Sequence, residues 1–251
     1  MLGTPACPRA GDISTRAVWF SVAAPPPVKE VDRLIADLDA RMRLLSAPAT
    51  NEVRAVRRIV SRQLRRASES TVIALANRLV ARDAGFDRFL AYEILTWHRP
   101  ALAQLGTSDL RRLGRGMDSW GDVDTFACYV AGPVWRDEQV PDAEVARWSR
   151  SSDRWWRRAA IVSTVPLNSR ARGGSGDSTR TLGICQLVLD DPDPMVVKAL
   201  SWALRELAKR VPADVERFLE DHGERVAALV RREVRSKLQT GLKTARKHAR
   251  S

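Results

Sequence analysis

Two segments of this 251-residue chain align with each other at a spacing of forty residues: Asp153-Arg154-Trp155-Trp156-Arg157-Arg158-Ala159 and Asp193-Pro194-Met195-Val196-Val197-Lys198-Ala199. In both segments a basic residue is followed by alanine, and Val53-Arg54-Ala55 repeats that pair near the amino end. A period close to this length is typical of solenoids that are built from paired helices. The repeat therefore predicts an all-α solenoid.

Apolar residues recur at three- and four-residue spacing from Val28 onward, and few alternating runs indicate strands. Helices joined mostly by short turns are expected near residues 29–45, 51–66, 69–82, 86–97, 107–115, 119–131, 141–149, 152–165, 177–190, 194–210, 212–221 and 223–240. The buried stripe of helix 194–210 is predicted to contain Val196, Leu200, Ala203, Leu204 and Leu207. The longest break, residues 168–176, is expected to be a flexible cationic loop. Its Arg172 belongs either to a plain linker or to a phosphate contact.

The composition indicates a folded and strongly basic protein. Hydrophobic residues make up 44% of the chain, and 42 lysines and arginines against 30 acidic residues give a net charge of +12. Such a charge favours a polyanionic partner, either nucleic acid or an acidic membrane surface. Three widely spaced cysteines without a CxxC pair predict neither a disulfide framework nor a zinc site, and they fit a reducing cytoplasm.

Three regions are expected along the chain. Residues 1–27 are interpreted as a disordered or non-native leader that ends in three prolines, with a secretory signal peptide as the alternative. Residues 28–240 are expected to form one solenoid domain, and residues 241–251 a basic tail. No apolar run approaches the roughly 18 residues that a membrane helix needs. We therefore expect a soluble, monomeric, cytoplasmic protein.

Two helical stripes carry the candidate functional residues. Trp120 and Asp124 are four residues apart, so they share one face of a predicted helix. The second stripe combines large basic and aromatic side chains at helical spacing: Lys198, Trp202, Arg205 and Lys209. Trp202 either packs against a neighbouring helix or contacts a sugar or base. For Asp124, a helix-surface or capping role is the alternative.

The repeated basic residues predict a cationic surface. If stacked repeats place Arg54, Arg158 and Lys198 on inner helices, their charges line one concave basic groove. For each of them the alternative is a solvated helix face. The remaining tryptophans are assigned to packing: at least one of Trp155 and Trp156 is expected in the core, and the other structural ones are Trp97, Trp135 and Trp148.

Three blocks of the sequence, in this order, resemble the bacterial DNA alkylation repair proteins of the AlkD type: Ser119-Trp120-Gly121-Asp122-Val123-Asp124, Trp156-Arg157-Arg158-Ala159-Ala160-Ile161 and Lys198-Ala199-Leu200-Ser201-Trp202-Ala203-Leu204-Arg205-Glu206. The resemblance covers roughly residues 30 to 240. It implies a HEAT-like solenoid that wraps double-stranded DNA and excises alkylated bases, chiefly 3-methyladenine and 7-methylguanine, as a glycosylase.

The resemblance also implies roles for individual residues. Asp124 becomes the catalytic carboxylate, and Trp120 and Trp202 become the aromatic walls of the cleft. Arg158 would contact the DNA backbone near the lesion. Apart from the resemblance, the repeat, the basic stripe and the 168–176 break predict that further cations hold the DNA: Lys198, Arg54, Arg205 and Arg172. One departure is visible, because Met195-Val196-Val197 stands where the best-known members carry aromatic residues. The range of lesions is therefore left open.

The residue inventory agrees with the implied chemistry. A purine alkylated at N3 or N7 is already cationic and leaves as a neutral base, so one carboxylate suffices without a general acid. No lysine is singled out beside Asp124 as a Schiff-base nucleophile, which predicts a monofunctional enzyme. The histidines show no metal-ligand spacing, and neither a metal nor a cofactor is expected. The alternative is a non-catalytic HEAT-like solenoid that binds DNA or a protein partner.

Overall fold

Residues 28–244 are described by the computed structural model, and within them the chain forms helices and no β-strand. The leader expected at 1–27 and the end of the basic tail, 245–251, lie outside the described residues. No helix in the described part of the chain is both long enough and apolar enough to cross a membrane.

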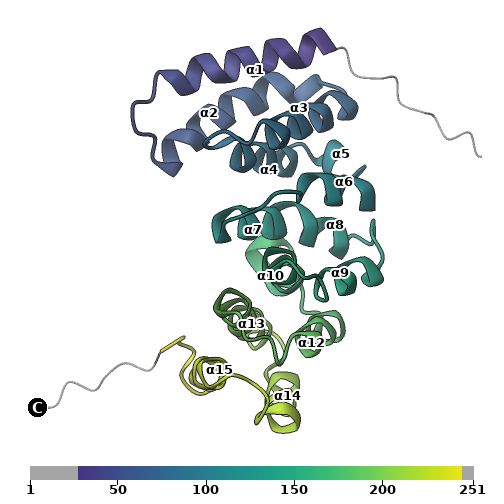
Figure 1. The fold of residues 1–251 in the computed structure, drawn as a ribbon, viewed down its shortest axis with the longest axis vertical. Helices are drawn as coiled ribbons and strands as arrows, with labels where there is room; N and C mark the ends of the chain where they lie inside the picture. Colours follow the sequence, from purple (N-terminus) through teal and green to yellow (C-terminus); the bar gives the residue numbers. More distant parts are fainter. Residues whose placement is uncertain (1–27, 245–251) are drawn as a thin grey trace, which may run out of the picture.

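The helices form two layers that follow each other along the molecule (Figure 1). The inner layer consists of α2 (Thr50–Gln63), α4 (Asp87–Trp97), α7 (Trp120–Phe126), α10 (Arg154–Val162), α13 (Pro194–Leu207) and α15 (Ala228–Thr240). Each of these helices packs on the next in this order. The outer layer consists of α1 (Val28–Arg43), α3 (Glu69–Arg82), α6 (Thr107–Leu113), α9 (Asp142–Trp148), α12 (Ser178–Leu187) and α14 (Pro212–His222). Short helices lie in the connections: α5 (Arg99–Leu102), α8 (Gly132–Arg136) and α11 (Val165–Asn168).

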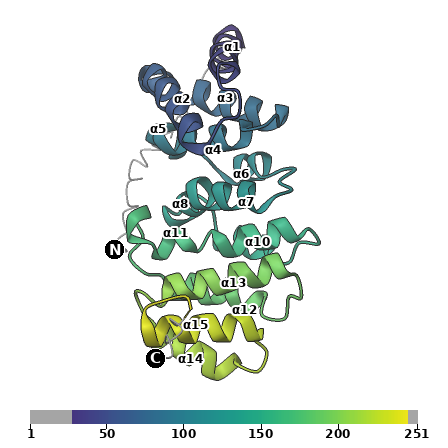
Figure 2. The same cartoon turned by 90° about the vertical axis from the view of Figure 1, so that its left-hand side faces the viewer.

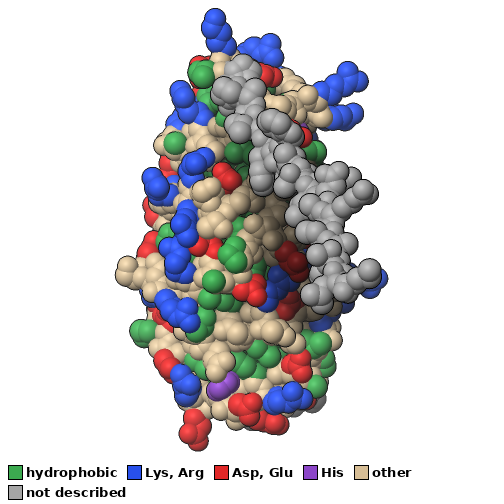
Figure 3. Space-filling model, turned by 90° about the vertical axis from the view of Figure 1, so that its right-hand side faces the viewer, with side chains coloured by type: hydrophobic (Ala, Val, Ile, Leu, Met, Phe, Trp, Pro, Cys, Tyr) green, Lys and Arg blue, Asp and Glu red, His purple; other side chains and the backbone are tan. Residues whose placement is uncertain are grey.

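The stack bends into an arc, and the inner layer follows the inside of the bend, where Figure 2 shows α10, α13 and α15 one above the other. The predicted HEAT-like solenoid is therefore confirmed. The opposite face, toward α9, α12 and α14, carries basic and acidic side chains interspersed with each other (Figure 3).

The forty-residue repeat corresponds to two neighbouring inner helices. Asp153 and Asp193 are the residues that precede α10 and α13, and each carboxylate accepts a hydrogen bond from a backbone N–H two residues later, at 2.8 Å. Such caps satisfy N–H groups that a helix start leaves unpaired. Arg158 and Lys198 follow at equivalent positions of the two helices, and Arg54 lies on the inner helix α2, as the repeat predicts.

The apolar core runs continuously through the stack. The predicted stripe of α13 is confirmed, since its five members are at most 1% exposed. Trp135 and Trp148 are buried as expected, and Trp156 packs against Trp148 with ring centroids 5.1 Å apart. Trp97 was assigned to the same structural group, and that assignment is wrong: its side chain is 65% exposed, because it ends α4 where the chain turns into α5.

Proline residues explain several of the differences from the predicted helices. Pro133 lies inside the continuous helical run from α7 to α8. Pro166 stands in the first turn of α11, where its missing N–H group leaves no helical bond unmade. The helix predicted at 152–165 therefore ends at Val162, and α11 follows as a separate turn. The helix predicted at 119–131 continues instead through a π-helical segment, Ala127–Ala131, into α8.

The break at 168–176 is not the flexible loop that its glycines predict. Asn168 is fully buried, and its amide nitrogen donates to the carbonyl of Thr164 at 3.0 Å and to the Thr181 hydroxyl at 2.9 Å. Its side-chain oxygen accepts the N–H of Asp177 at 2.9 Å. A buried amide with these partners fixes both ends of the connection, and a 3-10 turn, Arg170–Arg172, lies between them.

Gly114 provides a test of the packing between the layers. A Cβ atom at this position would lie 2.5 Å from Cη2 of Trp156 and 3.2 Å from Cζ of Phe126. We expect Gly114→Ala to lower the free energy of unfolding by about 1–3 kcal/mol, because the rings must move in a filled core. Urea denaturation followed by circular dichroism measures the change.

Gly183 is the matched control, since it is an exposed position of α12 where an added Cβ meets no atom within 4 Å among the described residues. Gly183→Ala is expected to stabilise the protein by roughly 0.5–1 kcal/mol through helix propensity. Equal effects of the two substitutions would contradict the packing described for Gly114.

Candidate functional site

Helix α7 presents the first pair of candidate residues. Ser119 caps the helix by accepting the N–H of Asp122 at 3.2 Å, and its hydroxyl donates to the Asp122 carboxylate at 2.7 Å. Asp122 is thus occupied in the capping interaction. Trp120 opens the helix with 62% of its surface exposed, and Asp124 lies one turn later.

The Asp124 carboxylate is held by Arg158 of α10. Nε of Arg158 donates to one carboxylate oxygen at 2.9 Å and Nη2 donates to the other at 2.8 Å. Nη1 of the same guanidinium donates to the carbonyl of Met195, in the first turn of α13. Arg158 therefore joins three inner helices. The side chain of Arg158 is 7% exposed and that of Asp124 is 19% exposed, so the pair is largely withdrawn from water while part of the carboxylate stays open.

Burial shifts the pKa of this carboxylate. Withdrawal from water raises the pKa of Asp124 above its usual value of 3.8, and the hydrogen bonds and charge of Arg158 oppose that rise. The Arg158 guanidinium thus orients the carboxylate and favours its charged form. A contact of Arg158 with the DNA backbone stays a prediction, because three of its N–H groups are engaged within the protein.

Helix α13 supplies the second aromatic candidate. Trp202 is half-buried and packs against the core, and the rest of its side chain is open to solvent. Lys198, one turn earlier, is exposed. Arg205, one turn later, is half-buried, with Nε 3.2 Å from the Ser201 hydroxyl and 3.6 Å from a carboxylate oxygen of Glu233 in α15. Burial lowers the pKa of Arg205.

The candidate residues lie on three successive helices of the inner layer. Trp120 and Asp124 come from α7, Arg158 from α10 and Trp202 from α13, and α10 packs on both of the other helices. Hydrogen bonds unite Asp124, Arg158 and the start of α13. The meeting of the two predicted aromatic walls around Asp124 stays a prediction.

A second cluster joins the other two predicted cations around a tyrosine. The Arg172 guanidinium lies 4.8 Å from the ring centroid of Tyr129, in the π-helical segment. Arg54 approaches the same residue from α2, with Nη2 3.4 Å from the Tyr129 hydroxyl. Its Nε donates to the carboxylate of Glu93 at 2.7 Å. Arg54 and Arg172 are therefore brought together, although they are 118 residues apart in the sequence.

Glu93 and Tyr129 are members of this cluster that were not predicted from the sequence. Glu93 is 4% exposed, and its second oxygen accepts Nε of Arg57 at 3.0 Å. Arg57, one turn after Arg54 on α2, is buried for this reason. A signal for Glu93 exists in the sequence, because it is a single acid inside the apolar run Leu90-Ala91-Tyr92-Glu93-Ile94-Leu95. A buried acid at such a position requires a cationic partner.

The comparisons with known proteins give one match. The sequence model of the family described as DNA alkylation repair enzyme matches residues 48–238. This range contains the candidate residues of α2, α7, α10 and α13 as well as Glu93 and Tyr129. No curated protein and no solved structure matches the chain.

The Arg158–Asp124 pair makes stability depend on pH in a predictable direction. A carboxyl group whose pKa is raised by folding destabilises the folded state increasingly as the pH rises through its titration range. Removal of the guanidinium in Arg158→Met raises that pKa further. We expect the variant to lose about 1–3 kcal/mol of stability at neutral pH and less at acidic pH, measured as thermal unfolding across the pH range.

The double variant Asp124→Asn/Arg158→Met separates charge from packing. Without the carboxylate, the loss at neutral pH should shrink toward the loss at acidic pH. A deficit of Arg158→Met that is the same at every pH would show that the pair does not act through the charge of Asp124.

Proposed function

Because this chain belongs to the family of DNA alkylation repair enzymes, we propose that it is a glycosylase that hydrolyses the N-glycosidic bond of alkylated purines in duplex DNA. The proposed substrates carry a formal positive charge on the base, as 3-methyladenine and 7-methylguanine do. The observation that carries the proposal is the Asp124 carboxylate, which two hydrogen bonds from Arg158 hold on the inner layer, one turn from the exposed Trp120.

The positive charge of the alkylated base makes it a good leaving group. The bond from C1′ of deoxyribose to the base nitrogen breaks with its electron pair going to the base, which departs neutral and needs no proton. Positive charge then develops on the sugar. The Asp124 carboxylate stabilises that charge, and it does so more strongly in a partly dry site than in water. Water adds to C1′ and loses its proton to the carboxylate, which returns it to solvent.

Arg158 has a positioning role in this scheme. Each oxygen of Asp124 accepts one hydrogen bond from the guanidinium, and each retains a lone pair for a water molecule or the sugar. Because the pair is bidentate, the carboxylate is oriented before the substrate arrives. Such preorganisation lowers the cost of reorganisation at the moment of bond cleavage.

The tryptophans and the cations complete the proposal. The exposed indole of Trp120 and the half-buried indole of Trp202 would attract the cationic sugar by about 0.5–2 kcal/mol each, depending on how much water is displaced. The exposed Lys198 would contact the phosphate backbone, with Arg54 and Arg172 at a second point around Tyr129. Binding that depends on such contacts weakens steeply with added salt.

Asp124→Asn tests the enzymatic proposal directly. We expect release of 3-methyladenine and 7-methylguanine from methylated duplex DNA to fall by about 100-fold or more, because the amide carries no charge to stabilise the sugar cation. Chromatography of the released bases measures the rate, and fluorescence anisotropy measures binding, which should be retained.

Asp122→Asn is the matched control, because it lies on the same helix and its amide oxygen can still accept the Ser119 hydroxyl. Its rate should remain close to that of the wild type. If the wild-type protein releases neither base while it binds the duplex, the protein is a non-catalytic solenoid and the proposal fails.

The pH profile of base release provides a second test. Catalysis requires the ionised carboxylate, and burial raises the pKa of Asp124 above 3.8. Activity should therefore increase with pH through a titration centred above 3.8, after subtraction of the base lost spontaneously from the DNA. A titration centred at or below pH 3.8 would contradict the role given to this carboxylate. The residual activity of Asp124→Asn is expected to lack this titration.

A further inference from the structure

A basic cavity of about 450 Å³ lies between the second half of α2 and the junction of α4 with α5, away from Asp124. Its lining includes Trp97 and five arginines: Arg57, Arg58, Arg62, Arg65 and Arg99. Of these arginines only Arg57 has a carboxylate partner within the described residues. The volume is within the roughly 300–1,000 Å³ that is usual for small-ligand sites.

The indole of Trp97 contacts a buried cation. The Arg57 guanidinium lies 4.7 Å from the ring centroid, and its Nε is held by the buried carboxylate of Glu93 at 3.0 Å. Arg57 is itself 6% exposed, so the cation behind the ring has little freedom. Trp97 nevertheless leaves 65% of its surface open. An aromatic plane that contacts a cation on one side and is otherwise open can serve as a stacking surface.

The two properties together define the ligand. Several uncompensated guanidinium groups around one cavity attract an anion with many oxygens, such as a phosphate. The aromatic plane beside them accepts a flat ring. A phosphate joined to a planar base satisfies both properties.

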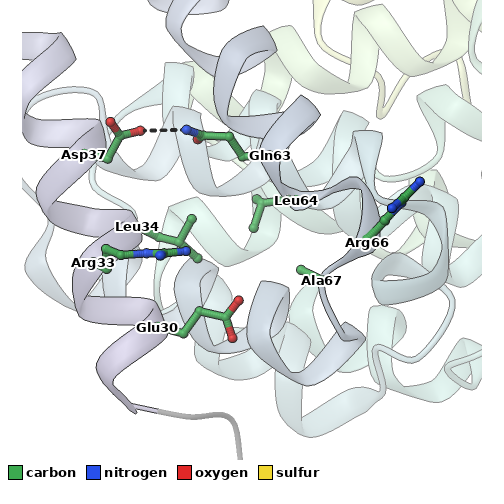
Figure 4. Close-up of a pocket in the computed structure, with 8 residues that line it drawn as sticks. All are labelled: Glu30, Arg33, Leu34, Asp37, Gln63, Leu64, Arg66 and Ala67. Atoms are coloured by element: carbon green, nitrogen blue, oxygen red, sulfur yellow. Dashed lines mark hydrogen bonds between the residues drawn. The ribbon is translucent and has the colours of Figure 1, made fainter.

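A neighbouring cavity of similar size shows that arginines alone do not make such a site. It lies between α1 and the end of α2, measures about 440 Å³ and contains Arg33 and Arg66 (Figure 4). Two carboxylates, Glu30 and Asp37, line the same cavity, and Asp37 accepts a hydrogen bond from Gln63 at 3.2 Å. Its charges are balanced, so it does not favour an anion.

We propose that the Trp97 cavity binds an unpaired, phosphate-bearing nucleotide of a DNA strand, with the base stacked on the indole and the phosphate among the arginines. Bases inside an intact duplex are covered on both faces by their neighbours, so a strand end or single-stranded segment fits this geometry. The Glu93 carboxylate links Arg57 of this cavity to Arg54, which lies beside Tyr129 together with Arg172. The choice of DNA as the source of the nucleotide rests on the proposed function.

The test compares two unmethylated duplexes of equal paired length, one blunt and one with a short 5′-phosphorylated thymidine overhang. Fluorescence anisotropy at fixed salt gives the ratio of their dissociation constants. We expect wild type to bind the overhang duplex about 5- to 150-fold more tightly, the range expected for stacking of one base. Trp97→Ala should remove this preference, and Trp97→Phe should restore part of it. Trp97 is mostly exposed, and circular dichroism checks that both variants fold.

Arg62→Ala and Arg66→Ala form a matched pair from neighbouring positions that line the two different cavities. The overhang preference should fall in Arg62→Ala and persist in Arg66→Ala. The inference is overturned if wild type shows no preference, or if Trp97→Ala keeps it. Base release from blunt methylated duplex should be unchanged in the Trp97 variants. That assay reports on the proposed glycosylase alone, so the failure of one proposal is distinguishable from the failure of the other.

Discussion

The ion pair between Arg158 and Asp124 is the interaction on which the arrangement of the central inner helices depends. The Arg158 guanidinium, on α10, donates hydrogen bonds to a carboxylate of α7 and to a backbone carbonyl at the start of α13. A charge withdrawn from water is tolerated when its hydrogen-bonding groups have partners, and it is costly when they do not. Small displacements of any of the three helices would leave such a group unpaired. The packing therefore specifies the position of the carboxylate, and the carboxylate in turn constrains the packing.

The same principle recurs along the inner layer and modifies the simple picture of a cationic groove. Arg54 and Arg57 share Glu93, and Arg205 lies near Glu233, so these arginines are paired with acids rather than presented as a row of free charges. The net charge of +12 still gives the whole molecule an attraction for polyanions. The buried acids fix certain guanidinium groups in defined orientations. Exposed residues such as Lys198 are left to attract polyanions nonspecifically.

Periodicity predicted the parts of the fold that repeat, and it failed where a single side chain decides the local structure. The buried stripe of α13 and the aspartate caps of α10 and α13 follow from patterns that extend over a whole helix. Asn168 stabilises its connection through hydrogen bonds to three residues that no periodic pattern relates to it. Trp97 is exposed because α4 ends at this residue. Within the candidate site, helical spacing predicted that Trp120 and Asp124 share a face. It gave no information on Glu93 or Tyr129, whose partners come from other repeats.

In a solenoid each repeat contacts chiefly its neighbours, so separate parts of the stack can open independently unless something couples them. Arg158 provides such coupling for the middle of this molecule, because its hydrogen bonds span three consecutive inner helices. We therefore expect the central helices to unfold as one cooperative unit. Glu93 joins α4 to α2, and Glu233 joins α15 to α13, so links of the same kind extend toward both ends of the stack. A sequence change that breaks one of these links is expected to lower the cooperativity of unfolding as well as the stability.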